Sequence, residues 1–503
     1  MARACGPRYT SAGNPTLAAW YRISSDFRDR LKQPSLTCHG VGMSVVPNRA
    51  GLCFLKFLEW NRAIYIILAM GLALRILALS LVSHIPLRNE APGYMRMAAE
   101  LLHHQNFEPY WPPGVPYYLY LVQKLFGESI LIARASILPI YVAFTAFLYL
   151  LVKQAVTLRA ANLAALIFVF YPPYVRDSFN PSTEYPAAAC VMGIVLFMTR
   201  AERKPSFAPI ALTGLSLGAL ILIRPSSLLV AAFVCYYLFR RLRNVKIAVA
   251  PLVIAAILVS AWMWKAYTLT GRFVAINDSN SQNLFWGNNP YTPLYATWGE
   301  AQGEIGISAG YRSLLSGIDR ESPQDRDRLY TELALDHIKS RPGLFVLRTS
   351  NRARAYFGFP VHYAEPLKSV LGKQSRMWAA ILLTVADVLF YWTLMILAIV
   401  FLFNTEKAPT VSDRRLCLLG TALAYALPYW VSISQPRYNF PVVPLLAVFA
   451  VTFLDFFLQA RASEVLLPIR ESARRRYAML LVLAAFAYIQ IEWIYVNYFR
   501  LRG

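Results

Sequence analysis

Two acidic side chains in the sequence could act as a general base toward a substrate hydroxyl or amine. Glu90 lies in RNEAPGYMRMAAELL, just after an apolar stretch, and Glu184 lies in NPSTEYPAAAC, where another apolar stretch begins. A positioned carboxylate can take a proton from an attacking group. Each acid also has an ordinary interpretation: Glu90 as a solvated loop residue, and Glu184 as the first residue of a helix capped by Ser182 or Thr183.

Two arginines could supply positive charge beside these acids. Arg224 lies in ILIRPSSLL and Arg437 lies in SISQPRYNFPVVP. A guanidinium group binds phosphate oxygens through paired N–H donors, so the two arginines together would suit a phosphorylated substrate. Each alone is equally explained by a side chain that extends to the membrane surface. For Arg75, inside an apolar run, we expect a structural partner within the helix bundle.

The sequence contains no recognisable metal or nucleotide site. His103 and His104 are adjacent, but no third ligand follows at a suitable spacing. No Walker motif or glycine-rich phosphate loop is present, which disfavours an ATPase. We therefore expect no cofactor; a divalent cation is compatible with the sequence but not indicated.

The elements that must position these residues are apolar. Of the 503 residues, 57% are hydrophobic and 15% are charged, whereas soluble domains carry about 25% charged residues. Many runs approach the length needed to cross a hydrocarbon core of about 30 Å. We predict an all-α polytopic membrane protein with about eleven spans, at residues 62–83, 131–152, 160–175, 184–199, 207–223, 226–239, 247–267, 378–403, 416–433, 440–459 and 477–497.

The net charge of +23 fits the same interpretation. Lys and Arg lie mainly in short segments between apolar runs, which disfavours nucleic-acid binding. If residues 62–83 leave the cytoplasm, every strongly basic short loop falls on the cytoplasmic side, as the positive-inside rule predicts. This orientation requires residues 112–126 to be an interfacial helix that does not cross. It places both acids and both arginines on the outer side of the membrane.

Four regions follow from this topology. We expect a disordered cytoplasmic tail at residues 1–56, an N-terminal membrane module at 57–267, an outer loop domain at 268–377 and C-terminal membrane helices at 378–503. Met43 begins a segment more typical of a natural start, so we hypothesise that residues 1–42 are a misassigned extension. Within the outer loop domain, Ser322 and Pro323 predict the start of an amphipathic helix.

Several segments, taken in order, resemble the GT-C superfamily of membrane glycosyltransferases. They are similar to its bacterial branch of protein O-mannosyltransferases and lipid A aminoarabinose transferases, the glycosyltransferase family 39-like proteins. The similarity extends over about residues 60–460. The segments are NEAPGYMRMAAELL with PPGVPYYLYLVQKLFG, RDSFNPSTEYPAA, ILIRPSSLL, GRFVAINDSNSQNLFWGNNP, SQPRYNFPVVPLL and the helix that ends in SRPGLF.

The resemblance implies roles for the two acids. Relatives carry a catalytic acid, usually Asp, four residues before a Tyr in the first outer loop, and Glu90 holds that place relative to Tyr94. Glu184 matches a second acid at the start of a later span. Glu in place of Asp moves the carboxylate by about one methylene, and a misplacement near 1 Å can be costly in catalysis.

A second departure concerns phosphate binding. The aminoarabinose branch has a Lys before the proline of the interfacial segment, where this chain has Trp111 followed by two prolines. We therefore assign phosphate binding to Arg224 and Arg437.

The resemblance implies an inverting hexosyl- or pentosyltransferase of the inner (plasma) membrane with an extracytoplasmic active site. Its donor would be a polyprenyl-phosphate-linked sugar, and its acceptor a glycan, lipid or protein. We expect Tyr94, Trp286, Asn288 and Asn289 to bind substrate, although NNP is equally a turn signal. Two alternatives stay open: a lipid or glycolipid flippase or transporter, and a catalytically inactive GT-C-like scaffold. The large one-sided loop and the lack of matched broken spans disfavour a transporter.

Overall fold

The computed structural model describes residues 49–83, 85–103, 107–279, 281–294, 309–318, 320–359, 372–459 and 472–502. These residues form helices joined by turns and loops, with no β-strand among them. The first helix, α2 (Arg49–Glu59), begins inside the region expected to be a disordered tail. Residues 1–48, including Met43, lie outside the described residues.

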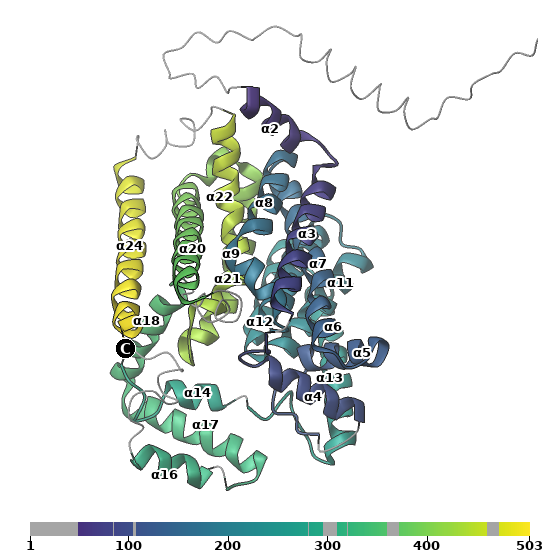
Figure 1. Ribbon diagram of the computed structural model, residues 1–503, viewed down its shortest axis with the longest axis vertical. Helices are drawn as coiled ribbons and strands as arrows, with labels where there is room; N and C mark the ends of the chain where they lie inside the picture. The colour runs from purple at the N-terminus through teal and green to yellow at the C-terminus, as the bar shows by residue number, and fades with distance from the viewer. Residues whose placement is uncertain are drawn as a thin grey trace, which may run out of the picture. The chain divides into compact units, whose positions relative to one another are not determined.

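Each of the eleven predicted spans lies largely in helices, although the span at 160–175 is interrupted at Tyr171 (Figure 1). Among the described residues, five helices are long and apolar enough to cross a membrane, or six if one bent pair counts as a single span. The chain is therefore a multi-pass membrane protein, while the number eleven stays a prediction. The predicted spans correspond to helices α3 (Ala63–Val82), α6 (Ile130–Ala135), α7 (Ile137–Ala155), α8 (Leu158–Phe170), α9 (Pro172–Arg176), α10 (Glu184–Arg203), α11 (Phe207–Ile223), α12 (Leu228–Leu242), α13 (Val245–Thr270), α20 (Lys373–Leu402), α21 (Pro409–Val431), α22 (Val443–Leu458) and α24 (Ala473–Arg502).

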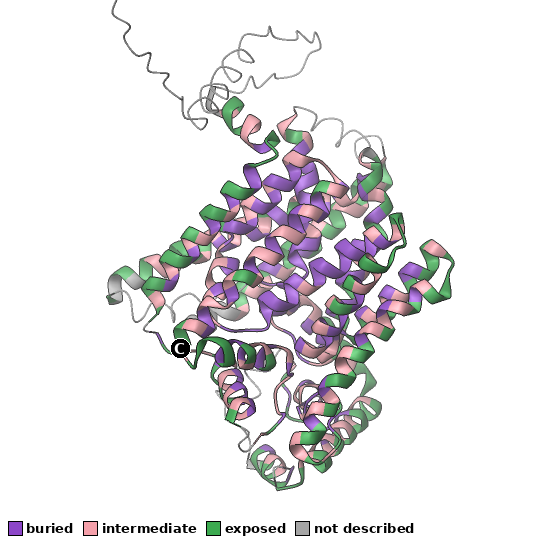
Figure 2. Ribbon diagram, turned by 90° about the vertical axis from the view of Figure 1, so that its right-hand side faces the viewer, coloured by how far each residue is buried: buried purple, intermediate pink, exposed green. Residues whose placement is uncertain are grey.

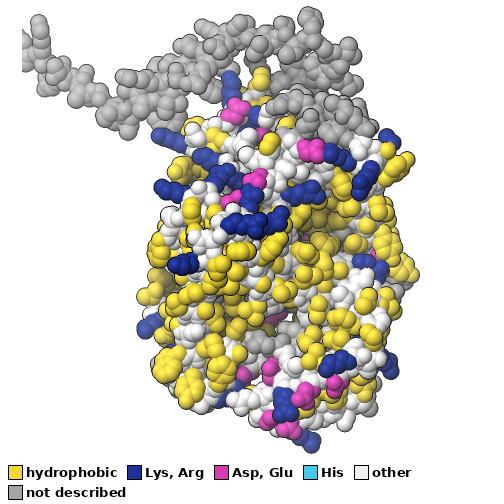
Figure 3. Space-filling model, turned by 180° about the vertical axis from the view of Figure 1, so that it is seen from behind, with side chains coloured by type: hydrophobic (Ala, Val, Ile, Leu, Met, Phe, Trp, Pro, Cys, Tyr) yellow, Lys and Arg dark blue, Asp and Glu magenta, His cyan; other side chains and the backbone are white. Residues whose placement is uncertain are grey.

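The surface of the bundle matches an apolar solvent. Figure 3 shows hydrophobic side chains over a broad band of one face, with charged side chains gathered above and below the band. Large apolar residues are exposed on several helices, including Leu77, Ile257, Leu382 and Leu481. An exposed apolar surface of this extent is unusual for a soluble monomer and is expected where helices meet lipid.

Buried residues fill the interior of the bundle (Figure 2), and α10 is buried along most of its length. Arg75 is fully buried there, as predicted, but its partners are neutral. It donates to the carbonyl oxygens of Gly71, Val169 and Tyr174 and to the hydroxyl of Tyr185. These bonds fasten α3 to α8, α9 and α10, so Arg75 has a structural role.

A bend after α8 brings the chain toward the start of α10. Helix α8 and the segment Pro172–Phe179 meet at 62°. Two consecutive prolines lack N–H donors, and the residue before a proline disfavours helical geometry. Accordingly, Tyr171 is extended (φ −62°, ψ 118°). The bend places residues 177–183 in a turn that leads to Glu184.

The two segments predicted to lie on the outer side, residues 84–130 and 268–377, contain shorter helices: α4 (Ala91–His103), α5 (Gly114–Phe126), α14 (Gln282–Gly287), α16 (Ala309–Ile318), α17 (Pro323–Ser340) and α18 (Pro342–Tyr356). The predicted interfacial helix is α5. The predicted amphipathic helix is α17, and Ser322 accepts a hydrogen bond from the N–H of Asp325 as its cap. In Figure 1, α14, α16 and α17 lie at the same end of the bundle as α4 and α5.

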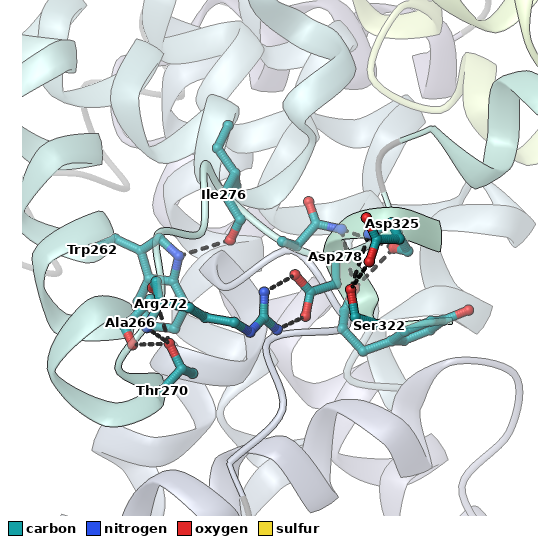
Figure 4. Close-up of polar contacts among 11 residues, drawn as sticks. Trp262, Ala266, Thr270, Arg272, Ile276, Asp278, Ser322 and Asp325 are labelled. Carbon is teal, nitrogen blue, oxygen red and sulfur yellow. Dashed lines mark hydrogen bonds and ion pairs between the residues drawn. The ribbon is translucent and has the colours of Figure 1, made fainter. Parts of the chain in front are cut away.

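Polar contacts join residues 84–130 to residues 268–377, the two segments predicted to lie on the outer side. The loop after α13 is folded on itself by the Arg272 and Asp278 ion pair and by a hydrogen bond from Trp262 to the carbonyl of Ile276 (Figure 4). The N–H of Asp278 then donates to the carbonyl oxygen of Pro109 at 2.8 Å. The beginning of the predicted loop domain is thus attached to the chain just before α5.

Candidate functional site

The structure brings Glu90 and Arg437 into direct contact. Glu90 directly precedes α4, and Arg437 lies in the short helix η5 (Pro436–Asn439) between α21 and α22. Arg437 Nη1 donates to Glu90 Oε2 at 3.0 Å, and Nη2 donates to Oε1 at 2.5 Å. Both side chains are about one-fifth exposed. The guanidinium group therefore engages both oxygens of the predicted base.

The second acid and the second arginine also form a pair. Glu184 is the first residue of α10, and Arg224 directly follows the last residue of α11. Arg224 Nη2 donates to Glu184 Oε1 at 3.0 Å. Thr183 stands at the cap position of α10, yet its side chain makes no capping hydrogen bond. The main side-chain partner of Glu184 is thus an arginine from another helix.

A tyrosine connects the two pairs. The guanidinium carbons of Arg224 and Arg437 each lie 5.2 Å from the ring centre of Tyr438. Tyr438 is 5% exposed and stacks on Tyr429, with ring centres 4.6 Å apart. A cation beside an aromatic ring is attracted by the ring's quadrupole. Arg224 and Arg437, the two predicted phosphate ligands, therefore both lie against the ring of Tyr438. We did not predict Tyr438 as a site residue, although it directly follows Arg437 in the sequence.

Local backbone geometry explains how Glu90 is presented. Asn89 adopts a left-handed conformation with φ 55°, which Asn tolerates better than most residues. The side chain of Asn180 both accepts from the N–H of Arg88 and donates to its carbonyl oxygen. Since Asn180 lies four residues before Glu184, these two bonds hold the segments of the two acids together.

Tyr94 lies beside this cluster. Its N–H donates to the carbonyl oxygen of Glu90 at 3.0 Å, so the predicted spacing of four is the first turn of α4. Its ring is buried and meets Trp111 edge to face, with centres 5.4 Å apart. Gly93 permits this packing, because a Cβ there would lie 2.4 Å from Trp111 Nε1. Burial and then the charge of Glu90 raise the pKa of Tyr94 well above its usual range, so Tyr94 is neutral at pH 7.

Charge interactions settle the protonation state of Glu90. Burial raises the pKa of its carboxyl group, but the charge and hydrogen bonds of Arg437, a backbone hydrogen bond and the charge of Arg224 together lower it by more. The net result is a pKa below the ordinary value for glutamate. Glu90 is therefore a carboxylate at neutral pH, as a general base must be before it accepts a proton.

The asparagines at the end of α14 have structural contacts. Asn288 Nδ2 donates to the carbonyl oxygens of Leu284 and Val431, and Asn289 Nδ2 donates to that of Phe285. Both residues are 1% exposed. With their amide donors used inside the protein, we leave Asn288 and Asn289 out of the substrate contacts proposed below. Trp286 is half-buried and packs against the main core.

An arginine that we did not predict anchors α14 near the site. Arg352 Nη1 donates to the carbonyl oxygens of Gly287 and Ser432 at 2.9 and 2.5 Å. Burial first, and then the charge of Arg348, lower the pKa of Arg352 to about 9. Since Ser432 begins the turn that leads to Arg437, Arg352 joins the predicted loop domain to the segment that carries the site.

The guanidinium groups of Arg224 and Arg437 are donors that suit an anion. Across the residues that the structure describes, no three His, Cys, Asp or Glu side chains are grouped so that they could hold a metal ion. His103 instead contacts Glu128 at 2.6 Å, and His104 lies outside the described residues.

Comparison with known proteins agrees with the resemblance seen in the sequence. The family model for dolichyl-phosphate-mannose-protein mannosyltransferase matches residues 111–264, a segment that contains Glu184 and Arg224 but not Glu90 or Arg437. The match covers less than half of the chain and agrees with the resemblance to the GT-C superfamily of glycosyltransferases. A comparison with curated protein sequences gives no match.

Solved structures similar to this chain include oligosaccharyltransferases from Archaeoglobus fulgidus. One is a complex with Zn and sulfate (15% identity, TM-score 0.46, covering 83% of this chain and 52% of that chain). Another is AglB with an inhibitory peptide and a dolichol-phosphate (14% identity, TM-score 0.44, covering 86% of this chain and 55% of that chain). ArnT from Cupriavidus metallidurans, bound to undecaprenyl phosphate, is also similar (13% identity, TM-score 0.39, covering 79% of this chain and 80% of that chain). The chain spans about half the length of the archaeal proteins, and similarities this low assign neither function nor site.

Proposed function

We propose that this GT-C protein transfers a sugar from a polyprenyl-phosphate-linked donor to a cell-envelope acceptor on the outer side of the membrane. The observation that carries the proposal is the meeting of Glu90, Glu184, Arg224 and Arg437 in two ion pairs beside Tyr438. The four residues come from four separate segments, and each was selected from the sequence for its chemistry. Their assembly provides a base and a phosphate site in one place.

The reaction needs a base and a site for the leaving group. The acceptor oxygen or nitrogen attacks the anomeric carbon and gives its proton to Glu90. The bond between that carbon and the phosphate oxygen breaks, with inversion at carbon, and polyprenyl phosphate leaves with the electron pair. Arg224 and Arg437 offset the charge that develops on the phosphate. Because phosphate is a good leaving group, positioning and charge stabilisation supply most of the rate increase.

The orientation follows from charge. The positive-inside rule places the basic loops in the cytoplasm and the four site residues outside. We propose that the donor lies in the outer leaflet of the plasma membrane and that the acceptor enters from the aqueous side. The sugar, hexose or pentose, and the acceptor, whether glycan, lipid or protein, are left to experiment.

The test uses purified full-length protein in lipid nanodiscs with a panel of polyprenyl-phosphate hexoses and pentoses. Release of polyprenyl phosphate and formation of glycosylated acceptor are followed by mass spectrometry in the presence of a cell-envelope extract. Glu90→Gln is expected to lower transfer by about a hundredfold or more, the usual contribution of a general base. Glu100→Gln is a matched control, because Glu100 is on α4 and pairs only loosely with Arg96, at 3.6 Å.

The outcomes separate the three functions considered from the sequence. A glycosyltransferase cleaves the donor, a flippase moves the intact donor between leaflets, and an inactive scaffold does neither. Transfer by Glu90→Gln at the wild-type rate would remove Glu90 from the mechanism.

A further inference from the structure

Arg437 binds both oxygens of the base proposed above. Both carboxylate oxygens of Glu90 accept from Arg437, at 3.0 and 2.5 Å. A general base must have an oxygen within hydrogen-bond reach of the proton that it takes. While Arg437 keeps this geometry, an acceptor hydroxyl competes with a charged, two-point contact, and charged two-point contacts are among the strongest hydrogen bonds in proteins.

Arg224 is engaged to a smaller extent. One hydrogen bond of 3.0 Å joins its Nη2 to Glu184. Its Nε is buried and has no hydrogen-bond partner among the described residues. An arginine presents five N–H donors, so Arg224 has donors to offer an anion without leaving Glu184. The two arginines differ in how many carboxylate oxygens they bind: Arg224 binds one oxygen of Glu184, whereas Arg437 binds both oxygens of Glu90. Arg224 is therefore the arginine that can bind a phosphate without losing its carboxylate partner.

We propose that the donor phosphate binds Arg224 and draws Arg437 away from Glu90, so that binding of the donor frees the base. This inference rests on the function proposed above. The exchange breaks no covalent bond: Arg437 gives up a carboxylate and gains a phosphate oxygen. Contact with the Tyr438 ring keeps its guanidinium group near Arg224 in the starting state. In the donor-free state, the charges of Glu90 and Glu184 balance those of Arg437 and Arg224. The phosphodiester of the donor adds a negative charge, so it competes with the two carboxylates for the two arginines.

The exchange sets an order of binding. The acceptor is deprotonated only after the donor has bound, because until then the charged two-point contact with Arg437 stabilises the carboxylate of Glu90 and makes it a poor proton acceptor. It also requires Glu90 and the donor phosphate to be competitors for Arg437. Removing the charge of Glu90 must then strengthen the binding of phosphate, although the same change abolishes catalysis.

The experiment measures the affinity of a short-chain polyprenyl phosphate, which carries no sugar and cannot react, for the full-length protein in nanodiscs. Glu90→Gln is expected to tighten binding by about fivefold or more, the lower end of coupling between linked sites. Arg437→Gln is expected to weaken it. In the double variant Glu90→Gln/Arg437→Gln, the gain from Glu90→Gln must disappear, since it acts through Arg437. Glu100→Gln is expected to leave the affinity unchanged.

Glu90→Asp is a second variant that keeps the test valid if the neutral variant Glu90→Gln misfolds. It keeps the charge but shortens the side chain, so it loosens the two-point contact and is expected to tighten binding by less than Glu90→Gln does. Unchanged or weaker binding in both Glu90 variants, with the protein still monodisperse, overturns the exchange.

The result also separates this inference from the proposed function. If the wild-type protein does not bind polyprenyl phosphate, the proposed function itself fails. If it binds, and Glu90→Gln abolishes transfer without tightening binding, the function stands and the exchange is wrong.

Discussion

Arg224, at the end of α11, lies against the ring of Tyr438, a residue that the chain reaches only after α21. The guanidinium carbon of Arg224 is 5.2 Å from the ring centre, and that of Arg437 is at the same distance. Neither arginine is placed by its own helix alone. The ring of Tyr438 holds together two cations that would otherwise repel, and Glu90 and Glu184 balance their charges.

Replacing Tyr438 is therefore expected to change donor binding. Each cation–π contact contributes about 0.5–2 kcal/mol, so Tyr438→Leu should raise the KM for the donor about tenfold with a smaller change in kcat. Tyr438→Phe keeps the ring and should retain a KM near the wild-type value. Steady-state kinetics with a lipid-linked donor measures both.

Tyr141→Leu provides the control for Tyr438. Tyr141 also stacks on an arginine, with Arg75 3.8 Å from its ring centre, but inside the bundle. Its loss should lower thermal stability without a selective effect on donor KM. An equal rise of KM in both leucine variants would show that the effect of Tyr438 is only structural.

The pair of Arg224 and Glu184 predicts a difference in stability. Their side chains are 16% and 7% exposed, and removing one partner of a buried pair costs about 3–5 kcal/mol because the other charge is left unpaired. Arg224→Gln should therefore lower the unfolding temperature, and Arg224→Gln/Glu184→Gln should recover part of the loss. Thermal unfolding followed by size-exclusion chromatography in detergent measures this. A double variant less stable than Arg224→Gln would contradict the pairing.

The pKa of Glu90 predicts how activity depends on pH. In the donor-free protein, burial raises this pKa, while Arg437 and, to a smaller extent, a backbone hydrogen bond and Arg224 lower it, so the net pKa lies below the ordinary value. If the donor removes Arg437, burial acts without that opposition and the pKa rises. Activity requires the carboxylate, so kcat at saturating donor should fall with acid at a higher pH than kcat/KM for the donor does.

Arg437→Gln gives the matching control for the pH profile. Without the arginine, the acid limb of kcat/KM should move to higher pH, toward that of kcat. Identical acid limbs for kcat and kcat/KM in the wild-type protein would argue against a change in the surroundings of Glu90 on donor binding.

A substitution at Gly287 tests whether the contact between α14 and the turn after α21 is needed for stability and activity. A Cβ at Gly287 would lie 1.8 Å from the carbonyl oxygen of Ser432 and 2.4 Å from Arg352 Nη1. Gly287→Ala should therefore separate the two segments, lower stability by about 1–3 kcal/mol as overpacking does, and reduce transfer. Gly317→Ala in α16 is the control, because a Cβ there meets nothing within 4 Å. Equal stability of the two variants would show that the contact is dispensable.

Local sequence was sufficient to predict the helices and the residue types of the site. Apolar runs of spanning length predicted α3, α7, α13, α20 and α24, because a helix in lipid must be apolar along its length. Ser322 with Pro323 predicted the start of α17 through capping, which depends only on neighbouring residues. These signals are short in range, so a single sequence contains them.

The partners of the charged residues were decided only by the tertiary structure. The sequence grouped two acids and two arginines on one side of the membrane, but not Glu90 with Arg437, which lie 347 residues apart. It also did not predict that Asn288 donates a hydrogen bond to the carbonyl oxygen of Val431. A buried polar group must find a partner wherever packing puts it. That choice depends on how α11, α14 and α21 pack together, which no local pattern in the sequence specifies.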